Sequence, residues 1–140
     1  MGLNVYEVEK LHLSTSVRSF RTPDLADLIK AILDVNINKA KVLYDRCKFK
    51  YPIIITREIA KAKAWIRTQC QGTTRYGLLA SSGALRLKPE GIFVKNDISV
   101  ENWFLNEKSD VRSSYYLEDV VTEFDIQGLE LDYSIVAWDA

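Results

Sequence analysis

A polar turn between two apolar stretches, in the last quarter of the sequence, holds the residues best suited to chemistry. Val120 and Val121 are β-branched and predict a strand, and the apolar run from Ser134 to Trp138 predicts another. Between them, Asp125 can cap a turn by accepting hydrogen bonds from backbone N–H groups two or three residues further on. Gly128 lets the backbone approach a ligand closely. We therefore expect strand, tight turn, short helix and strand, with N–H groups exposed at a helix start, where anions bind.

Several carboxylates crowd the same region and suggest an alternative site. Carboxylate oxygens bind magnesium or calcium, so this cluster allows a metal-dependent nuclease. The lysine expected after the acids of such a nuclease is lacking, and much of the spacing suits capping or solvent-exposed acids. The residues are Glu118, Asp119, Glu123, Asp125, Glu130 and Asp132.

The composition predicts one globular domain with a real core. The chain has 140 residues, of which 47% are hydrophobic and 27% are charged. Nineteen basic and nineteen acidic side chains cancel, so the positive charge that drives nucleic-acid binding through counterion release is missing. Any nucleic-acid binding by this chain alone should be weak or confined to a patch. We see no membrane span and no signal peptide, which predicts a cytoplasmic protein with no membrane partner.

The cysteines and the histidine predict structural roles. Cys47 and Cys70 lie far apart and form no Cys-x-x-Cys pair, so two buried, reduced thiols are expected. His12 has no second histidine to join it. Neither a zinc site nor a Cys–His nucleophile pair has supporting spacing.

The first half of the chain predicts a helical hairpin and then a strand. Thr22 and Pro23 indicate a helix start, and apolar residues at helical spacing continue to Leu33. Asn36 or Asn38 opens a second helix, after a turn so short that the two helices should form a hairpin. The continuous apolar run of residues 51–56 predicts a strand buried on both faces.

The second half predicts a parallel sheet. Thr56 should cap a helix that Gly72 ends, and Tyr76–Ala80 is the next strand, so the crossover predicts parallel pairing. A short strand over residues 91–95 can follow. Residues 96–112 fit no regular element and suggest an irregular segment anchored by two aromatic residues.

Ligands of such sheets bind beyond the carboxyl ends of the strands. Three groups follow expected strands: Arg18, the pair Ser81 and Ser82, and the turn from Asp125 to Glu130. Parallel strands would open all of them on one edge of the sheet, which predicts a site there.

The central turn also resembles a known motif. Thr122-Glu-Phe-Asp-Ile-Gln-Gly-Leu-Glu-Leu-Asp132 resembles motif V of superfamily 1 helicases, and Leu13-Ser-Thr-Ser-Val-Arg18 resembles their motif IV. The wider stretch from Trp103 to Ala140, which contains Asp110-Val-Arg-Ser-Ser-Tyr-Tyr-Leu-Glu-Asp119, resembles the Schlafen group 3-like DNA/RNA helicase domain family of bacteria. The resemblance covers nearly the whole chain. It implies an α/β fold, RecA-like (P-loop NTPase-like), with a mostly parallel sheet flanked by helices.

The resemblance implies half of a nucleotide site. Arg18 would reach the γ-phosphate of ATP, with Arg21 as the alternative ligand. The backbone at Gly128, beside Gln127, would lie near the same phosphate, and Glu130 would contact the ribose or position the turn. Gln127 stands where better-known helicases have lysine, so the exact role of that lysine cannot be assigned to Gln127.

The resemblance also implies a surface that faces nucleic acid. Thr122 and Phe124 would face the strand, and Ser81 and Ser82 would add backbone contacts. Phe124 stands where better-known helicases have histidine, and core packing is its ordinary alternative.

The phosphate loop is absent from this sequence, which contains no Gly-x-x-x-x-Gly-Lys-Ser/Thr and no Gly-Lys pair. We therefore expect residues 1–140 to form a single domain, the C-terminal RecA-like domain of a helicase-like protein, without ATPase activity of its own. ATP with Mg²⁺ would be cofactors of the full-length protein, with none bound to this chain. Expected partners are DNA or RNA and the missing first RecA-like domain. The other alternative is a protein-interaction module that self-associates through an exposed edge.

Overall fold

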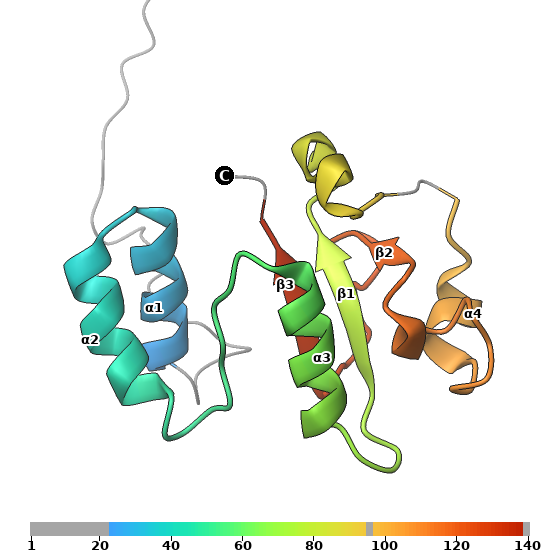
Figure 1. Ribbon diagram of the computed structural model, residues 1–140, viewed down its shortest axis with the longest axis horizontal. Helices are drawn as coiled ribbons and strands as arrows, with labels where there is room; N and C mark the ends of the chain where they lie inside the picture. The colour runs from blue at the N-terminus through green and yellow to red at the C-terminus, as the bar shows by residue number, and fades with distance from the viewer. Residues whose placement is uncertain (1–22, 95–96, 139–140) are drawn as a thin grey trace, which may run out of the picture. The chain divides into compact units, whose positions relative to one another are not determined.

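A computed structural model describes residues 23–94 and 97–138 of the chain (Figure 1). The chain divides into two compact units, residues 1–54 and 55–140, and each is described by itself. The predicted strand over residues 11–20, His12, Arg18 and Arg21 lie outside the described residues.

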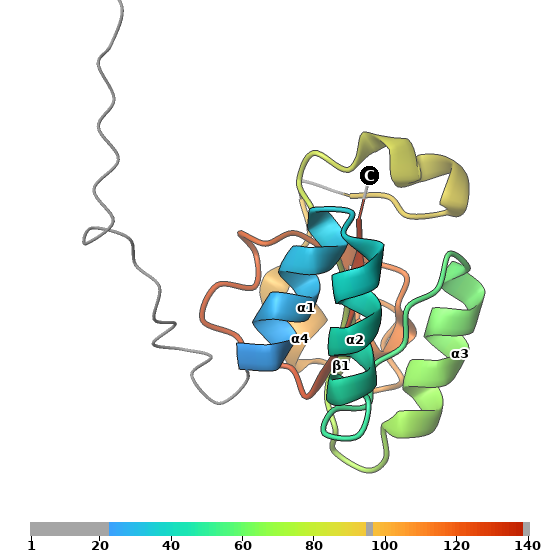
Figure 2. The ribbon, with the colours of Figure 1, turned by 90° about the vertical axis from the view of Figure 1, so that its left-hand side faces the viewer.

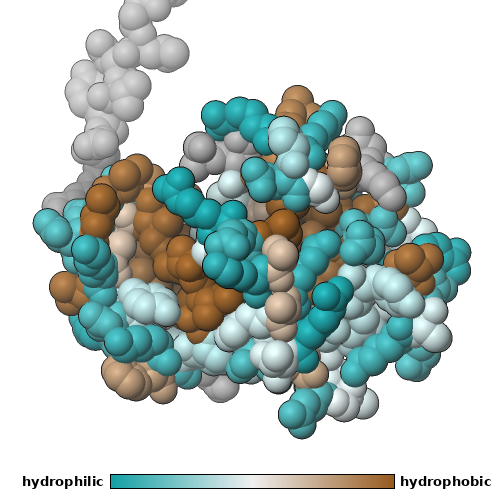
Figure 3. Space-filling view, viewed as in Figure 1, coloured by the Kyte–Doolittle hydropathy of each residue, from teal (hydrophilic) through white to brown (hydrophobic). Residues whose placement is uncertain are grey.

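The first unit contains the predicted helical hairpin. Helix α1 spans Pro23–Leu33 and helix α2 spans Ile37–Cys47, and Figures 1 and 2 show them side by side. Asn36 caps α2, because its side-chain oxygen accepts a hydrogen bond from the Lys39 backbone N–H at 3.1 Å. Leu28, Ala31, Leu43 and Cys47 form the core between the helices. The apolar stripes of the two helices therefore pack against each other, as predicted. Further apolar residues stay on the surface of the hairpin, where Figure 3 shows them in brown.

The predicted strand over residues 51–56 is wrong. These residues join no sheet, and Ile55 is 61% exposed. Ile53 instead packs against the hairpin core, where its carbonyl accepts a hydrogen bond from the Tyr44 hydroxyl at 3.2 Å. A short apolar run carries no periodicity that separates a strand from an extended segment lying on a helix pair.

The second unit is organised around a three-stranded parallel sheet. Strands β1 (Tyr76–Ala80), β2 (Val120–Val121) and β3 (Tyr133–Ala137) lie in the order β2-β1-β3. Both neighbours pair with β1 in parallel, which confirms the predicted α/β class with a parallel sheet. The expected strand at residues 91–95 is reduced to one bridge, from Val94 to Val120.

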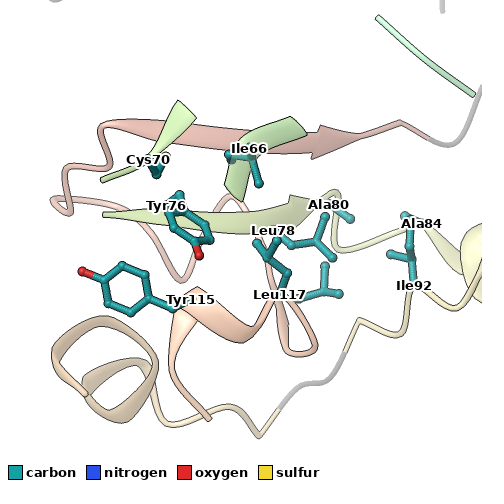
Figure 4. Packing of buried hydrophobic residues seen from close by; sticks show 10 residues of the cluster. Ile66, Cys70, Tyr76, Leu78, Ala80, Ala84, Ile92, Tyr115 and Leu117 are labelled. Atoms are coloured by element: carbon teal, nitrogen blue, oxygen red, sulfur yellow. The ribbon is translucent and has the colours of Figure 1, made fainter. Parts of the chain in front are cut away.

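Helix α3 (Ile59–Gln69) packs against one face of the sheet. Ile66 of α3 contacts a core that includes Leu78 of β1 and Leu117, and Figure 4 shows these side chains meeting. The rings of Tyr76 and Tyr115 meet edge to face there, with their centroids 5.2 Å apart.

The predicted cap of α3 is displaced. The helix begins at Ile59, and its first flanking residue, Glu58, makes no side-chain capping bond. Thr56 instead accepts a hydrogen bond from the Glu58 backbone N–H at 3.1 Å, two residues before the position that would cap the helix. Gly72 lies beyond the helix end with φ 61, a left-handed conformation that suits glycine.

The opposite face of the sheet is covered by helix α4 (Val100–Leu105), within the segment expected to be irregular. Ser99 caps this helix by accepting a hydrogen bond from the Asn102 N–H at 3.3 Å. Trp103 is fully buried against Leu79 and Val121, so one of the two aromatic residues anchors the segment as expected. The described part of this unit also contains two 3₁₀ helices: η2, Leu85–Glu90, and η3, Ser114–Tyr116.

Candidate functional site

The carboxyl ends of the parallel strands bring two loops to one edge of the sheet. Leu79 of β1 pairs with Val121 of β2, so the residues after Ala80 and after Val121 leave the sheet at the same level. The Ser81–Ser82 loop and the first residues after β2 therefore lie at the same edge of the sheet.

A side chain joins these two loops directly. The Ser82 backbone N–H donates to Glu123 Oε2 at 3.0 Å, and the Ser82 hydroxyl donates to Glu123 Oε1 at 3.2 Å. The pKa of Glu123 is lowered, first by its own backbone N–H and then by that of Ser82. This pair was not predicted, because Glu123 stood out only as one of several crowded acids. Its place at the end of β2, opposite the exit of β1, could have suggested the contact.

The turn after β2 is held by Thr122 and Asp125. Asp125 Oδ2 accepts hydrogen bonds from the Thr122 N–H at 2.8 Å and from its hydroxyl at 2.7 Å. The Thr122 hydroxyl oxygen in turn accepts from the N–H groups of Phe124, at 3.3 Å, and of Asp125, at 3.4 Å. The cap therefore belongs to Thr122, and the prediction that Asp125 bonds to residues further on is wrong. Residues 123–128 form successive turns rather than the expected short helix.

The predicted nucleic-acid residues differ in their access to solvent. The Phe124 side chain is 64% exposed, which argues against the core-packing alternative for this residue. Ser81 and Ser82 are exposed as well. Thr122 is only 6% exposed, and its hydroxyl is occupied inside the turn. Of the predicted nucleic-acid residues, Phe124, Ser81 and Ser82 are thus the ones that a ligand can reach.

The predicted nucleotide residues lie further along the same connection. Gly128 has φ 89, and no atom lies within 4 Å of the position that a Cβ would take, so its backbone is open to a ligand. Gln127 beside it is exposed, and its N–H donates to the Phe124 carbonyl at 3.4 Å. Arg18, the fourth of the predicted residues, lies outside the described part of the chain.

Glu130 does not share the carboxyl edge. It stands two residues before Asp132, whose carboxylate accepts a hydrogen bond from the Arg75 N–H at 2.7 Å, immediately before β1 begins. Between the two edges, Ile126 and Leu131 pack with Trp103 on the face of the sheet. The expectation that the whole turn through Glu130 opens at one edge is wrong, because the connection crosses the sheet toward the amino ends of the strands.

The crowded acids do not form a metal site. In the stretches that the structure describes, no three His, Cys, Asp or Glu residues gather in a group that could hold a metal ion. Glu118 pairs with Lys63 at 3.4 Å, and Glu123, Asp125 and Asp132 each hold a separate backbone contact. The geometry therefore does not support the nuclease alternative.

A surface depression of about 420 Å³ lies elsewhere on the second unit. It contains none of the predicted nucleotide or nucleic-acid residues, and Asp119 is the one member of the acid cluster that lines it. Its lining residues are Asp97, Ile98, Ser99, Asn102, Arg112 and Asp119.

Comparison with known proteins places the chain in a family. The family described as Schlafen group 3, DNA/RNA helicase domain, matches residues 1–140. Comparisons with curated proteins and with solved structures gave no match. None of the helices in the described ranges has the length and apolarity needed to cross a bilayer. The parallel sheet agrees with the RecA-like fold that the sequence resemblance implied. Because the match spans every residue of the sequence, the chain belongs to the Schlafen group 3 DNA/RNA helicase domain family.

Proposed function

We propose that this chain is the second RecA-like domain of a nucleic-acid-dependent ATPase, and that the carboxyl edge of its sheet faces the nucleic acid. The observation that carries the proposal is the joining of two exposed loops at that edge by the Ser82–Glu123 contact. Membership of a helicase domain family supports the same class of partner. DNA and RNA are both compatible with this chemistry.

Stacking is the main interaction that this edge offers to a single strand. The exposed ring of Phe124 stands on a turn fixed from below by Thr122, so the ring presents a preformed apolar surface. Stacking of one base on an aromatic side chain is worth about 1–3 kcal/mol and tolerates any base. Ser81 and Ser82 supply hydroxyl and backbone groups for the phosphate or sugar. The zero net charge keeps the affinity of the isolated chain modest.

The nucleotide half of the proposal concerns the same connection. ATP with Mg²⁺ would lie between this domain and a first RecA-like domain that carries the phosphate loop. Gln127 and the open backbone at Gly128 would face the phosphates, while Arg18 would supply positive charge. Glu130, near the amino ends of the strands, would position the connection rather than contact the nucleotide. Closure of the two domains on ATP would then couple hydrolysis to movement along the strand.

A binding measurement tests the nucleic-acid surface. The anisotropy of fluorescein-labelled oligo(dT) and oligo(U) is titrated with the full 140-residue chain and with Phe124→Ala. We expect the substitution to weaken binding about fivefold to a hundredfold, as loss of one stacked base predicts. Phe49→Ala is the matched control, because Phe49 is 85% exposed and belongs to the helical hairpin unit. Equal affinity of Phe124→Ala and the unsubstituted chain would contradict the proposed surface.

A protein-interaction module is the second candidate, and the outer strand of the sheet favours it. Within the described residues β3 pairs only with β1; Val136 on it is 47% exposed, and Trp138 immediately after it is 43% exposed. An open strand edge beside apolar side chains is a template for another chain. Sedimentation velocity at increasing protein concentration tests this candidate. A sedimentation coefficient that stays at the monomer value at every concentration would exclude self-association.

A further inference from the structure

The Glu123 carboxylate accepts hydrogen bonds from the same Ser82 donors that a phosphate at this edge would use. Ser82 contributes one N–H and one O–H, and both donate to the two oxygens of a single carboxylate. A phosphate group presents a similar pair of anionic oxygens to neighbouring N–H and O–H donors. Ser82 lies on an exposed loop, so these donors would otherwise be open to a ligand.

We propose that Glu123 is an internal competitor for phosphate, a gate that a phosphate group must displace before Ser82 can bind it. The proposal rests on the function proposed above, because it takes Ser82 as a ligand contact. It also assigns a role to a residue that the sequence singled out only as one of several acids.

The carboxylate of Glu123 can leave at small cost. Glu123 is exposed, and its hydrogen bonds to Ser82 can be exchanged for bonds to water. The neighbouring Asp125 cannot leave in the same way, because it holds the amide and hydroxyl of Thr122, which is 6% exposed. Two acids separated by one residue in the same turn therefore have different roles: Asp125 maintains the turn, and Glu123 can move.

The negative charge of Glu123 opposes phosphate binding at Ser82. While Glu123 lies on Ser82, its negative charge faces any approaching phosphate, and like charges repel. Rotation of Glu123 away from Ser82 exposes two donors and moves one negative charge outward. Substitution of Glu123 should therefore raise the affinity for phosphate-containing ligands, which is the opposite of what removal of a supporting contact would do.

The phosphate can come from a nucleic-acid backbone or from a nucleotide, and two probes distinguish these sources. Fluorescein-labelled oligo(dT) reports backbone phosphate through anisotropy, and ATP with Mg²⁺ reports nucleotide phosphate through calorimetry. The full chain is compared with Glu123→Ala and with Glu123→Gln, which keeps the side-chain length without the charge. Circular dichroism and thermal melting establish that each variant is folded.

We expect Glu123→Ala to bind one of the two probes about fivefold more tightly, the size of one exposed charge contact. The double variant Ser82→Ala/Glu123→Ala should lose most of this gain, because the hydroxyl donor is then missing. Glu107→Gln is the charge control, because it removes one exposed negative charge away from the carboxyl edge. Lys108, the next residue, bonds to the carbonyl of Gly72, which precedes the amino end of β1. The affinity of Glu107→Gln should equal that of the unsubstituted chain.

Unchanged or weaker binding by Glu123→Ala would overturn the gate. If the unsubstituted chain still bound oligo(dT) through Phe124, the proposed function would survive that result. A gain of equal size in Glu107→Gln would reduce the effect to net charge and also overturn the gate. Absence of binding by the unsubstituted chain and by every variant would overturn the gate and the proposed function together.

Discussion

The Thr122 hydroxyl makes three contacts within one turn and fixes how the chain leaves β2. It donates to Asp125 and accepts from the N–H groups of Phe124 and Asp125. These contacts orient Phe124 outward and Glu123 toward Ser82. The buried hydroxyl is thus a positioning group for the exposed residues around it.

Thr122→Val removes that hydroxyl at nearly constant volume. Two backbone N–H groups lose their acceptor, and we expect a loss of about 1–3 kcal/mol in the free energy of unfolding. Urea denaturation followed by circular dichroism measures this loss. Thr122→Ser, which keeps the hydroxyl, should retain most of the stability. A fully stable valine variant would show that the turn is held by other contacts.

Asp110 is the most perturbed carboxyl group among those with a shifted pKa. Hydrogen bonds from the side chain and then the backbone of Arg112 lower its pKa from 3.8 to about 2. Because the folded-state pKa is depressed, this contribution to stability is complete above the unfolded pKa of 3.8. It is lost as the pH falls through about 2.

An NMR titration of the Asp110 carboxyl carbon checks this shift. We expect a midpoint near pH 2 in the full chain. Arg112→Gln should raise the midpoint toward the ordinary value, because the charged donor is removed. A midpoint that does not respond to this substitution would refute the role of Arg112.

Some residue roles could be read from the sequence and others could not. Local spacing offered Asn36 as one of two caps, and the structure selects it. The exposure of Phe124 was expected only from the family resemblance, because residue type alone favours core packing. The direction of the Asp125 carboxylate could not be predicted, because this side chain can accept hydrogen bonds from N–H groups before or after it in the chain. In the structure it bonds to the N–H and the hydroxyl of Thr122, which precedes it. The Glu123–Ser82 contact joins residues 41 positions apart, and only the strand register brings them together.

The close approach of α4 to β1 depends on a glycine. A Cβ at Gly77 would clash with the indole ring of Trp103, which is fully buried and held by a hydrogen bond to the Asp119 carbonyl at 3.3 Å. Glycine at this position therefore lets the helix lie directly on the strand.

Gly77→Ala should destabilise the second unit by about 1–3 kcal/mol through overpacking. Thermal unfolding followed by tryptophan fluorescence measures the change. Gly83→Ala is the matched control, because no atom lies within 4 Å of its Cβ position, and it should melt like the unsubstituted chain. Identical melting of both variants would mean that the indole ring shifts at little cost.

Helices with strong periodicity were predicted, and isolated apolar runs were not. The sheet is parallel as predicted, but the expected crossover from a strand at 51–56 through α3 to β1 is absent, because β1 pairs with β2 and β3 instead. The run 51–56 had the composition of a buried strand, yet no neighbouring strand takes it up. Helix α4 was missed because its six residues are too few for a periodic signal. The course of the chain after Gly128 was missed because sequence does not give the direction of an irregular connection.

For the molecule as a whole, the absence of a phosphate-loop sequence from the 140 residues predicts no ATP hydrolysis by this chain alone. Phosphate release is measured with ATP, Mg²⁺ and oligo(dT) in the presence of the purified chain. We expect a rate equal to the protein-free background. Turnover that Arg18→Ala abolishes would contradict this prediction.

Strand β1 lies at the centre of its sheet, and this has a consequence for the order of folding. Leu78 pairs with Val120 on one side and Ile135 on the other, so both partners are synthesised long after it. The α1–α2 hairpin needs only neighbouring residues and can form early, as local contacts allow. The apolar strand Tyr76–Ala80 stays unpaired until β2 has been synthesised, and its second edge stays open until β3 follows. Kinetic refolding should therefore show helical signal before sheet signal, and aggregation during synthesis should begin at β1.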